Sequence, residues 1–184
     1  MKERTILFLD FDDVICLNVT YGGYDVIDAL GQVQKEQKTL NDFGDLWEKL
    51  FDERAKKNLR LLHDEFNPIY VLSTSWANVM NRAAIAAALR LSGLEFVANN
   101  LHDQWETPKG NLETRAYEIQ KWIYQNPEFR GYWVILDDEH SGTGLKDWVN
   151  PNDEKCLVLC QVDIGLADEE YQLVREAFLE RTKP

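Results

Sequence analysis

A chain of 184 residues, 45% of them hydrophobic and 11% aromatic, can fold around a substantial core, and this composition excludes an intrinsically disordered protein. Its formal net charge of −12 argues against a protein that coats nucleic acid, because neutralising phosphates requires clustered Lys and Arg. No apolar run approaches the roughly 18 residues of a membrane-spanning helix, so we expect a cytoplasmic protein without membrane partners.

Five short apolar runs predict the strands of a sheet, because each is too short for a helix and is rich in strand-forming residues. The third of them is the weakest candidate. In chain order they are Thr5–Leu9, Ile69–Leu72, Glu95–Ala98, Tyr132–Leu136 and Leu157–Val162. Because these runs are solidly apolar rather than alternating, they favour a parallel sheet that is covered on both faces.

Segments with helical periodicity lie between these runs. They are Asp45–Phe66, Asn78–Leu91, Leu112–Tyr124 and a last helix that begins near Asp168 as its N-cap. Residues 18–44 have weak periodicity and several Gly, Asp and Gln, so we predict a loop or small flap there. This alternation predicts right-handed crossovers and an α/β fold, a three-layer Rossmann-like sandwich around a parallel sheet of about five strands. No repeat or long Pro/Gly-rich linker interrupts it, and we expect one domain over residues 1–184.

Acids and hydroxyls directly follow three of the predicted strands. They are, in chain order, Asp10, Asp12, Ser73, Thr74, Asp137 and Asp138. The carboxyl ends of parallel strands collect active groups at one edge of a sheet, so we expect these side chains to converge. Converging carboxylates repel one another unless a hard cation lies between them, and oxygen ligands of this kind suit Mg²⁺. Magnesium in turn suits a phosphate substrate, whose oxygens it can bind while charge develops.

The string ILFLDFDDV resembles the first motif of the haloacid dehalogenase (HAD) superfamily, an apolar strand followed by Asp-x-Asp. This resemblance implies that Asp10 attacks phosphorus to form an aspartyl-phosphate. It also implies that Asp12 acts as general acid for the leaving oxygen and as base for the hydrolytic water. Dehalogenating members lack the second acid, so Asp12 favours a Mg²⁺-dependent phosphatase over a dehalogenase.

Two further strings resemble later motifs of the superfamily. IYVLSTSW resembles the second, in which a hydroxyl binds the phosphoryl group; Thr74 is the preferred residue and Ser73 the alternative. VILDDEH resembles the fourth, in which an acid after a strand completes the magnesium site. The resemblance therefore implies Asp10, Asp12 and Asp137 as metal ligands, with Asp138 as a further ligand or as a residue that supports the others.

The third motif supplies a Lys or Arg that holds the phosphate. Its candidates are Arg115, in ETRAYEIQKWI, and Lys109, in TPKGN, with Arg115 slightly ahead. The Arg115 helix and the closing segment VDIGLADEEYQLVREAF resemble a compact branch of the superfamily that is sometimes joined to RNA-repair modules, so the likeness covers nearly the whole chain. Only about 60 residues separate the first two motifs, which leaves no room for a large cap domain. Asp13 stands where Gly is usual, but Asp tolerates left-handed backbone.

Three other functions compete with a phosphohydrolase. A phosphotransferase would use the same site with another acceptor, and an inactive HAD-like module would bind phosphate for regulation. A signalling receiver domain also has acids and a hydroxyl on a parallel sheet, but it has a Lys after its last strand, and none follows LVLCQVD here. For the enzyme we expect a phosphorylated small molecule or a nucleotide as substrate, and the overall acidity argues mildly against a nucleic-acid end.

Aromatic residues and cysteines near these motifs have simpler explanations. Trp76 and Trp105 could stack on a substrate ring, but we expect them to pack in the core or at its rim. The cysteines, Cys16, Cys156 and Cys160, form no CxxC motif, so we expect reduced and mostly buried thiols.

Overall fold

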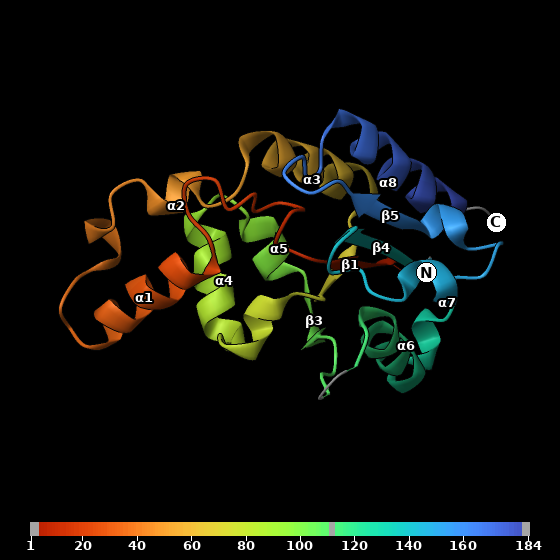
Figure 1. Ribbon diagram of the computed structural model, residues 1–184, viewed down its shortest axis with the longest axis horizontal. Coiled ribbons are helices and arrows are strands. Elements are labelled where there is room, and N and C mark those ends of the chain that lie inside the picture. The colour runs from red at the N-terminus through yellow and green to blue at the C-terminus, as the bar shows by residue number, and fades with distance from the viewer. Residues whose placement is uncertain (1–3, 111–112, 182–184) are drawn as a thin grey trace.

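The computed structural model describes residues 4–110 and 113–181 (Figure 1). Within these residues the chain forms a sheet of five parallel strands in the order β3-β2-β1-β4-β5. The strands are β1 (Ile6–Leu9), β2 (Ile69–Leu72), β3 (Leu101–Glu106), β4 (Trp133–Asp138) and β5 (Leu157–Cys160). The predicted α/β class and parallel sheet are confirmed.

The first strand of the chain lies at the centre of this sheet. Leu9, the last residue of β1, pairs with Leu72 on one side and with Leu136 on the other. The residues that follow β1 and β2, and the last two of β4, therefore emerge at the same edge. A receiver domain has the strand order 2-1-3-4-5, in which the third strand is central. The order 3-2-1-4-5 excludes that hypothesis.

Helices cover both faces of the sheet, as Figure 1 shows with α3 and α8 above it and α6 and α7 below. One face packs on α3 (Glu53–Phe66), α4 (Arg82–Leu91), α5 (Glu95–Asn99) and α8 (Asp168–Arg181), and the other on α6 (Arg115–Gln125) and α7 (Leu145–Trp148). Successive residues of a strand point to opposite faces, so Leu7 and Leu9 belong to the first core and Ile6 and Phe8 to the second. This is the predicted three-layer sandwich.

The predicted strand at Glu95–Ala98 is wrong, because these residues form helix α5. The strand lies instead at Leu101–Glu106, at the edge of the sheet, where Leu101 is the one buried residue. An edge strand that buries so little carries no apolar run, whereas α5 is apolar because Phe96, Val97 and Ala98 are buried.

Three predicted helices differ from the observed ones at their ends. Asp45–Phe66 is divided into α2 (Leu46–Lys49) and α3, and the side chain of Asp52 caps α3 by accepting a bond from the backbone N–H of Ala55. The Asn78–Leu91 segment begins as α4 only at Arg82, after the short 3-10 helix η2 (Ser75–Asn78). Of the predicted Leu112–Tyr124 helix, Leu112 lies outside the described residues, and α6 begins after its cap Thr114. The last helix begins where it was predicted, but Asp168 is its first residue rather than its N-cap.

The stretch predicted as a loop or flap, residues 18–44, contains a helix. This is α1 (Gly23–Gln34), followed by the short 3-10 helix η1 (Leu40–Asp42). It buries only Val26 and Ala29, which explains the weak periodicity of its sequence. In Figure 1 α1 lies at the left end of the molecule, on the side of α4.

Two short 3-10 helices, η3 (Pro127–Phe129) and η4 (Glu154–Cys156), precede β4 and β5. All three cysteines are free and buried, as expected. Among the described helices, none combines the length and the apolar character that crossing a bilayer requires.

Candidate active site

The turn after β1 begins with Asp10 and reverses the chain within a few residues. Asp10 stays on the sheet edge, because its backbone N–H donates to the carbonyl of Leu136 at 3.0 Å. Asp13 has a φ of +55°, so it adopts the left-handed conformation for which Gly is usual at this position. Its backbone N–H donates to the carbonyl of Cys16, and its carboxylate accepts the N–H of Asp163. The expectation that Asp would tolerate this turn is confirmed.

Three of the predicted acids form a buried cluster at the sheet edge. One carboxylate oxygen each from Asp10, Asp137 and Asp138 lies within 4.8 Å of the other two. The three residues are at most 1% exposed. They come from the ends of β1 and β4, which are neighbours in the sheet, so the register of the strands brings them together.

Arg115, the first residue of α6, reaches into this acidic cluster. Its Nη2 lies 3.4 Å from Asp10 Oδ1, and its Nε lies 3.0 Å from Asp137 Oδ2 without hydrogen-bond geometry. The Arg115 side chain is 9% exposed, and its Nη1 lies 3.3 Å from the carboxylate of Glu118. Glu118 was not predicted as a site residue, although a position three residues after Arg115 on a helix is a common place for its partner.

The charges of this cluster do not balance. Burial, and then the neighbouring charge of Asp137, raises the pKa of Asp10 well above its usual value, while Arg115 lowers it. Burial likewise raises the pKa of Asp137, against the lowering effect of Arg115. One guanidinium thus does not offset three buried carboxylates, and Asp137 Oδ2 has no hydrogen-bond partner among the described residues. A hard divalent cation such as Mg²⁺ fits this set of oxygen donors.

A residue that the sequence did not reveal, Ser141, touches all three acids. Its Oγ lies 3.2 Å from Asp10 Oδ2, 3.2 Å from Asp137 Oδ1, and also bonds Asp138 Oδ2. The other oxygen of Asp138 accepts the backbone N–H groups of His140 and Ser141, so Asp138 also closes the turn after β4. The sequence feature that could have identified Ser141 as a site residue was its position in a tight turn, four residues after Asp137.

The carboxylate of Asp12 does not belong to the acidic cluster. Its oxygens accept bonds from Trp76 Nε1 at 3.1 Å, Ser75 Oγ at 3.1 Å and Asn18 Nδ2 at 3.2 Å. The structure therefore differs from the expected arrangement in which the carboxylates of Asp10, Asp12 and Asp137 surround one ion. The role of Asp12 as a metal ligand stays a prediction. Trp76 is 3% exposed and stacks with Phe51, so its expected place in the core is confirmed.

The hydroxyl segment after β2 lies at the same edge of the sheet, and both Ser73 and Thr74 are fully buried. The backbone N–H of Ser73 donates to the carbonyl of Leu9, while its Oγ has no hydrogen-bond partner among the described residues. Thr74 Oγ1 accepts the N–H of Trp76 and caps η2. Lys109 Nζ donates to the carbonyl of Thr74 at 2.7 Å, and burial lowers the pKa of this lysine. Lys109 thus lies against the hydroxyl segment and Arg115 against the acids. The choice between Thr74 and Ser73 as the phosphate-binding hydroxyl, and between Arg115 and Lys109 as the phosphate-binding cation, stays open.

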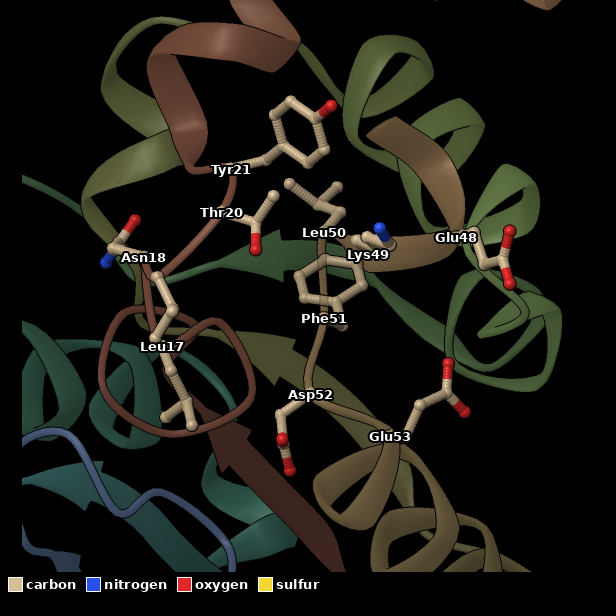
Figure 2. A pocket seen from close by; sticks show the side chains of 11 residues that line it. Leu17, Asn18, Thr20, Tyr21, Glu48, Lys49, Leu50, Phe51, Asp52 and Glu53 are labelled. Atoms are coloured by element: carbon tan, nitrogen blue, oxygen red, sulfur yellow. The ribbon is translucent and has the colours of Figure 1, made fainter. Parts of the chain in front are cut away.

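Two cavities flank this region. The first, of about 550 Å³, lies between α1 and residues 75–80 and has Asp12 in its wall. The second, of about 430 Å³, is lined by residues 17–21 and 48–53 (Figure 2). Figure 2 shows Leu50 and Phe51 at the centre of the view among the side chains that line this cavity, with the carboxylates of Glu48 and Glu53 to one side. Neither cavity is lined by the acidic cluster, and the first is the one that includes a predicted catalytic residue.

A scan against protein families matches residues 6–171 to the HAD domain in Swiss Army Knife RNA repair proteins. This match includes the acids, the hydroxyl segment, Lys109 and Arg115. No match was found among the curated proteins or among the solved structures. The parallel sheet and the acids at the ends of its central strands agree with this family match, which covers most of the chain. The chain therefore belongs to the HAD superfamily of phosphohydrolases and phosphotransferases, in the family of HAD domains of Swiss Army Knife RNA repair proteins.

Proposed function

We propose that this protein is a Mg²⁺-dependent phosphohydrolase that cleaves phosphomonoesters through an aspartyl-phosphate on Asp10. The observation that carries the proposal is the buried cluster of Asp10, Asp137 and Asp138, which meets Arg115 at the carboxyl end of the central strand. This is where parallel α/β sheets place their reacting groups. Buried acids with too few cations beside them are costly for stability, which favours a functional explanation over a structural one.

The acids of the cluster would hold Mg²⁺, and the ion would supply positive charge that stabilises the phosphoryl oxygens. Arg115 would bind the same phosphoryl group. Asp10 is 1% exposed, because Arg115 covers one of its oxygens and Ser141 the other. We infer that Arg115 transfers its Asp10 bond to a phosphate oxygen when substrate binds, which frees the carboxylate to attack. Lys109 and the hydroxyl of Ser73 or Thr74 would hold the remaining oxygens.

The reaction has two halves. In the first, a carboxylate oxygen of Asp10 bonds to phosphorus, the bond from phosphorus to the ester oxygen breaks, and that oxygen takes a proton from Asp12. In the second, a water gives a proton to Asp12 while its oxygen bonds to phosphorus, and the bond from phosphorus to the Asp10 oxygen breaks, which releases inorganic phosphate and restores the Asp10 carboxylate. An alcohol in place of this water would make the protein a phosphotransferase, and the same residues would act.

The test is phosphate release from a panel of phosphorylated metabolites and nucleotides, with Mg²⁺ and with EDTA. We expect activity that requires Mg²⁺ and that falls at least about a thousandfold in Asp10→Asn. Asp103→Asn is the matched control, because Asp103 is exposed on the edge strand β3, and it should keep full activity. Equal turnover by wild type and Asp10→Asn would remove the proposed nucleophile. Binding of inorganic phosphate without turnover of any panel member would favour the inactive, regulatory module instead.

A further inference from the structure

The cavity beside Asp12 lies where the leaving group of a phosphomonoester would be. Asp12 is the proposed proton donor to the ester oxygen, and its carboxylate is part of the cavity wall. The volume, about 550 Å³, is in the range of pockets that hold organic ligands, and a nucleoside-sized group fits within it. The part of the substrate beyond the ester oxygen would therefore be received here.

The charge of this cavity contrasts with that of the phosphoryl site. Among the ten described residues that line it, Asp12 is the only charged one, and none is Lys, Arg or His. The cations Arg115 and Lys109 do not line it and are bound to Asp10 and to Thr74. A second phosphate or carboxylate on the leaving group would find no cation in the wall of this cavity to balance its charge. The cavity is thus built for an uncharged group.

Apolar side chains from two segments of the chain line the cavity. Tyr24 and Ile27 of α1 form one wall, and Val79 and Met80 form part of the other. Tyr24 is 89% exposed and Val79 is 64% exposed, so neither side chain packs in the core. Exposed apolar side chains on two walls of one cavity are suited to enclosing a flat ring. The amide of Asn78, which also lines the cavity, can donate to and accept from the polar edge of such a ring.

Trp76 connects one wall of the cavity to Asp12. A Cβ on Gly23, the first residue of α1, would lie only 2.9 Å from two atoms of the Trp76 indole, so the helix contacts this ring through a glycine. Trp76 in turn donates from Nε1 to both oxygens of Asp12. A single ring therefore connects the start of α1 to the proposed general acid, and the cavity is positioned by the core.

We propose that this cavity binds the leaving group, and that the substrate is a phosphomonoester of an alcohol carrying a flat, uncharged ring of up to nucleoside size. Compounds with a second anionic group are rejected. This inference rests on the proposed function, because it takes Asp12 as the group that protonates the ester oxygen.

Steady-state kinetics on four probes test this specificity: naphthyl phosphate, adenosine monophosphate, glycerol phosphate and fructose bisphosphate. We expect KM for the two ring compounds to be at least about tenfold below that for glycerol phosphate, as is typical of stacking on one aromatic side chain. Fructose bisphosphate should have the lowest kcat/KM. Equal KM for ring and glycerol compounds, or efficient hydrolysis of the bisphosphate, would overturn the proposal.

Two variants locate the specificity in the cavity. Tyr24→Ala should raise KM for the ring compounds about tenfold and leave kcat and the glycerol phosphate kinetics unchanged. Tyr124→Ala is the matched control, because Tyr124 is 80% exposed on α6, away from this cavity, and it should change nothing. Val79→Lys, which adds a cation to the wall, should raise kcat/KM for fructose bisphosphate by about tenfold. An unchanged ring preference in Tyr24→Ala contradicts the assignment.

Failure of this inference can be told apart from failure of the proposed function. If Asp10→Asn abolishes turnover but Tyr24→Ala has no effect, the chemistry stands and the cavity assignment falls. If no probe is hydrolysed, calorimetric titration of the protein with naphthyl phosphate still tests the cavity. Binding that weakens about tenfold in Tyr24→Ala supports it, and equal binding or none overturns it.

Discussion

Replacing Arg115 by Met removes the guanidinium that pairs with Asp10 and Asp137 and keeps much of the side-chain volume. The Arg115 side chain is 9% exposed and the two aspartates are at most 2% exposed, so solvent screens these pairs very little. Removing one partner of a buried ion pair costs about 3–5 kcal/mol, because the other charge stays buried without compensation. The contact to Asp10 is long, at 3.4 Å, and the one to Asp137 lacks hydrogen-bond geometry, so we expect the lower end, about 3 kcal/mol.

Magnesium should reduce this deficit. A cation that binds only the folded protein adds about 2.7 kcal/mol of stability at a hundred times its dissociation constant. Without the positive charge of Arg115, the three acids should bind Mg²⁺ more tightly, so the ion should stabilise the variant more than the wild type. We expect the difference in unfolding free energy to shrink by at least about 1 kcal/mol between EDTA and saturating Mg²⁺.

Urea denaturation, followed by circular dichroism with and without Mg²⁺, measures both effects. Arg175→Met is the matched control. Arg175 pairs with Glu65 at 2.7 Å, but their side chains are 37% and 35% exposed, so this loss should be below about 1 kcal/mol and independent of Mg²⁺. An Arg115→Met variant that loses no more stability than Arg175→Met in EDTA refutes the stabilising ion pair of Arg115 with the acids. A loss that does not depend on Mg²⁺ refutes the idea that these acids share a cation site.

Four other substitutions have defined outcomes. Ser141→Ala, which removes the hydroxyl that contacts the three acids, should raise the Mg²⁺ concentration for half-maximal activity about tenfold, and an unchanged value assigns Ser141 to the turn alone. Of Ser73→Ala and Thr74→Val, one should lose about a hundredfold in kcat/KM, because a phosphoryl oxygen needs one of these hydroxyls; small losses in both contradict a hydroxyl ligand here. Burial lowers the pKa of His63 from its usual 6.5, so the unfolded chain binds the proton more readily and the unfolding free energy should fall as pH drops below about 6.5. His63→Gln should flatten this slope in urea denaturation between about pH 5 and 7, and an identical slope shows that another group causes it.

The sequence was a good guide to the fold wherever burial left a clear pattern. β1, β2, β4 and β5 appear in the sequence as apolar runs because helices cover both faces of the sheet that they form. The edge strand β3 does not, since its chain Leu-His-Asp-Gln-Trp-Glu meets solvent at most positions, and the apolar residues just before it belong to a helix. The apolar spacing of Asp45–Phe66 also continues across a break, so periodicity alone could not show that Asp52 starts a new helix.

For the site, sequence position was most informative where a residue ends a strand or directly follows one. Asp10, Asp137 and Asp138 meet because strand register fixes where each strand ends. The direction of the Asp12 side chain was not predictable, since it depends on Trp76 and Asn18 from other segments. Ser141 and Glu118 were missed for a related reason: a Ser in a turn and a Glu on a helix are common in any chain, and only their contacts with the acids and Arg115 distinguish them.

The most direct measurement is the capture of the covalent intermediate. A substrate that turns over, carrying radioactive phosphate, is mixed with the enzyme and Mg²⁺, quenched in acid within milliseconds, and the protein is digested and mapped. The proposed function predicts labelled phosphate on the peptide that contains Asp10, and none in Asp10→Asn. Turnover of that substrate with no label on the protein, or with label on a peptide that lacks Asp10, contradicts it.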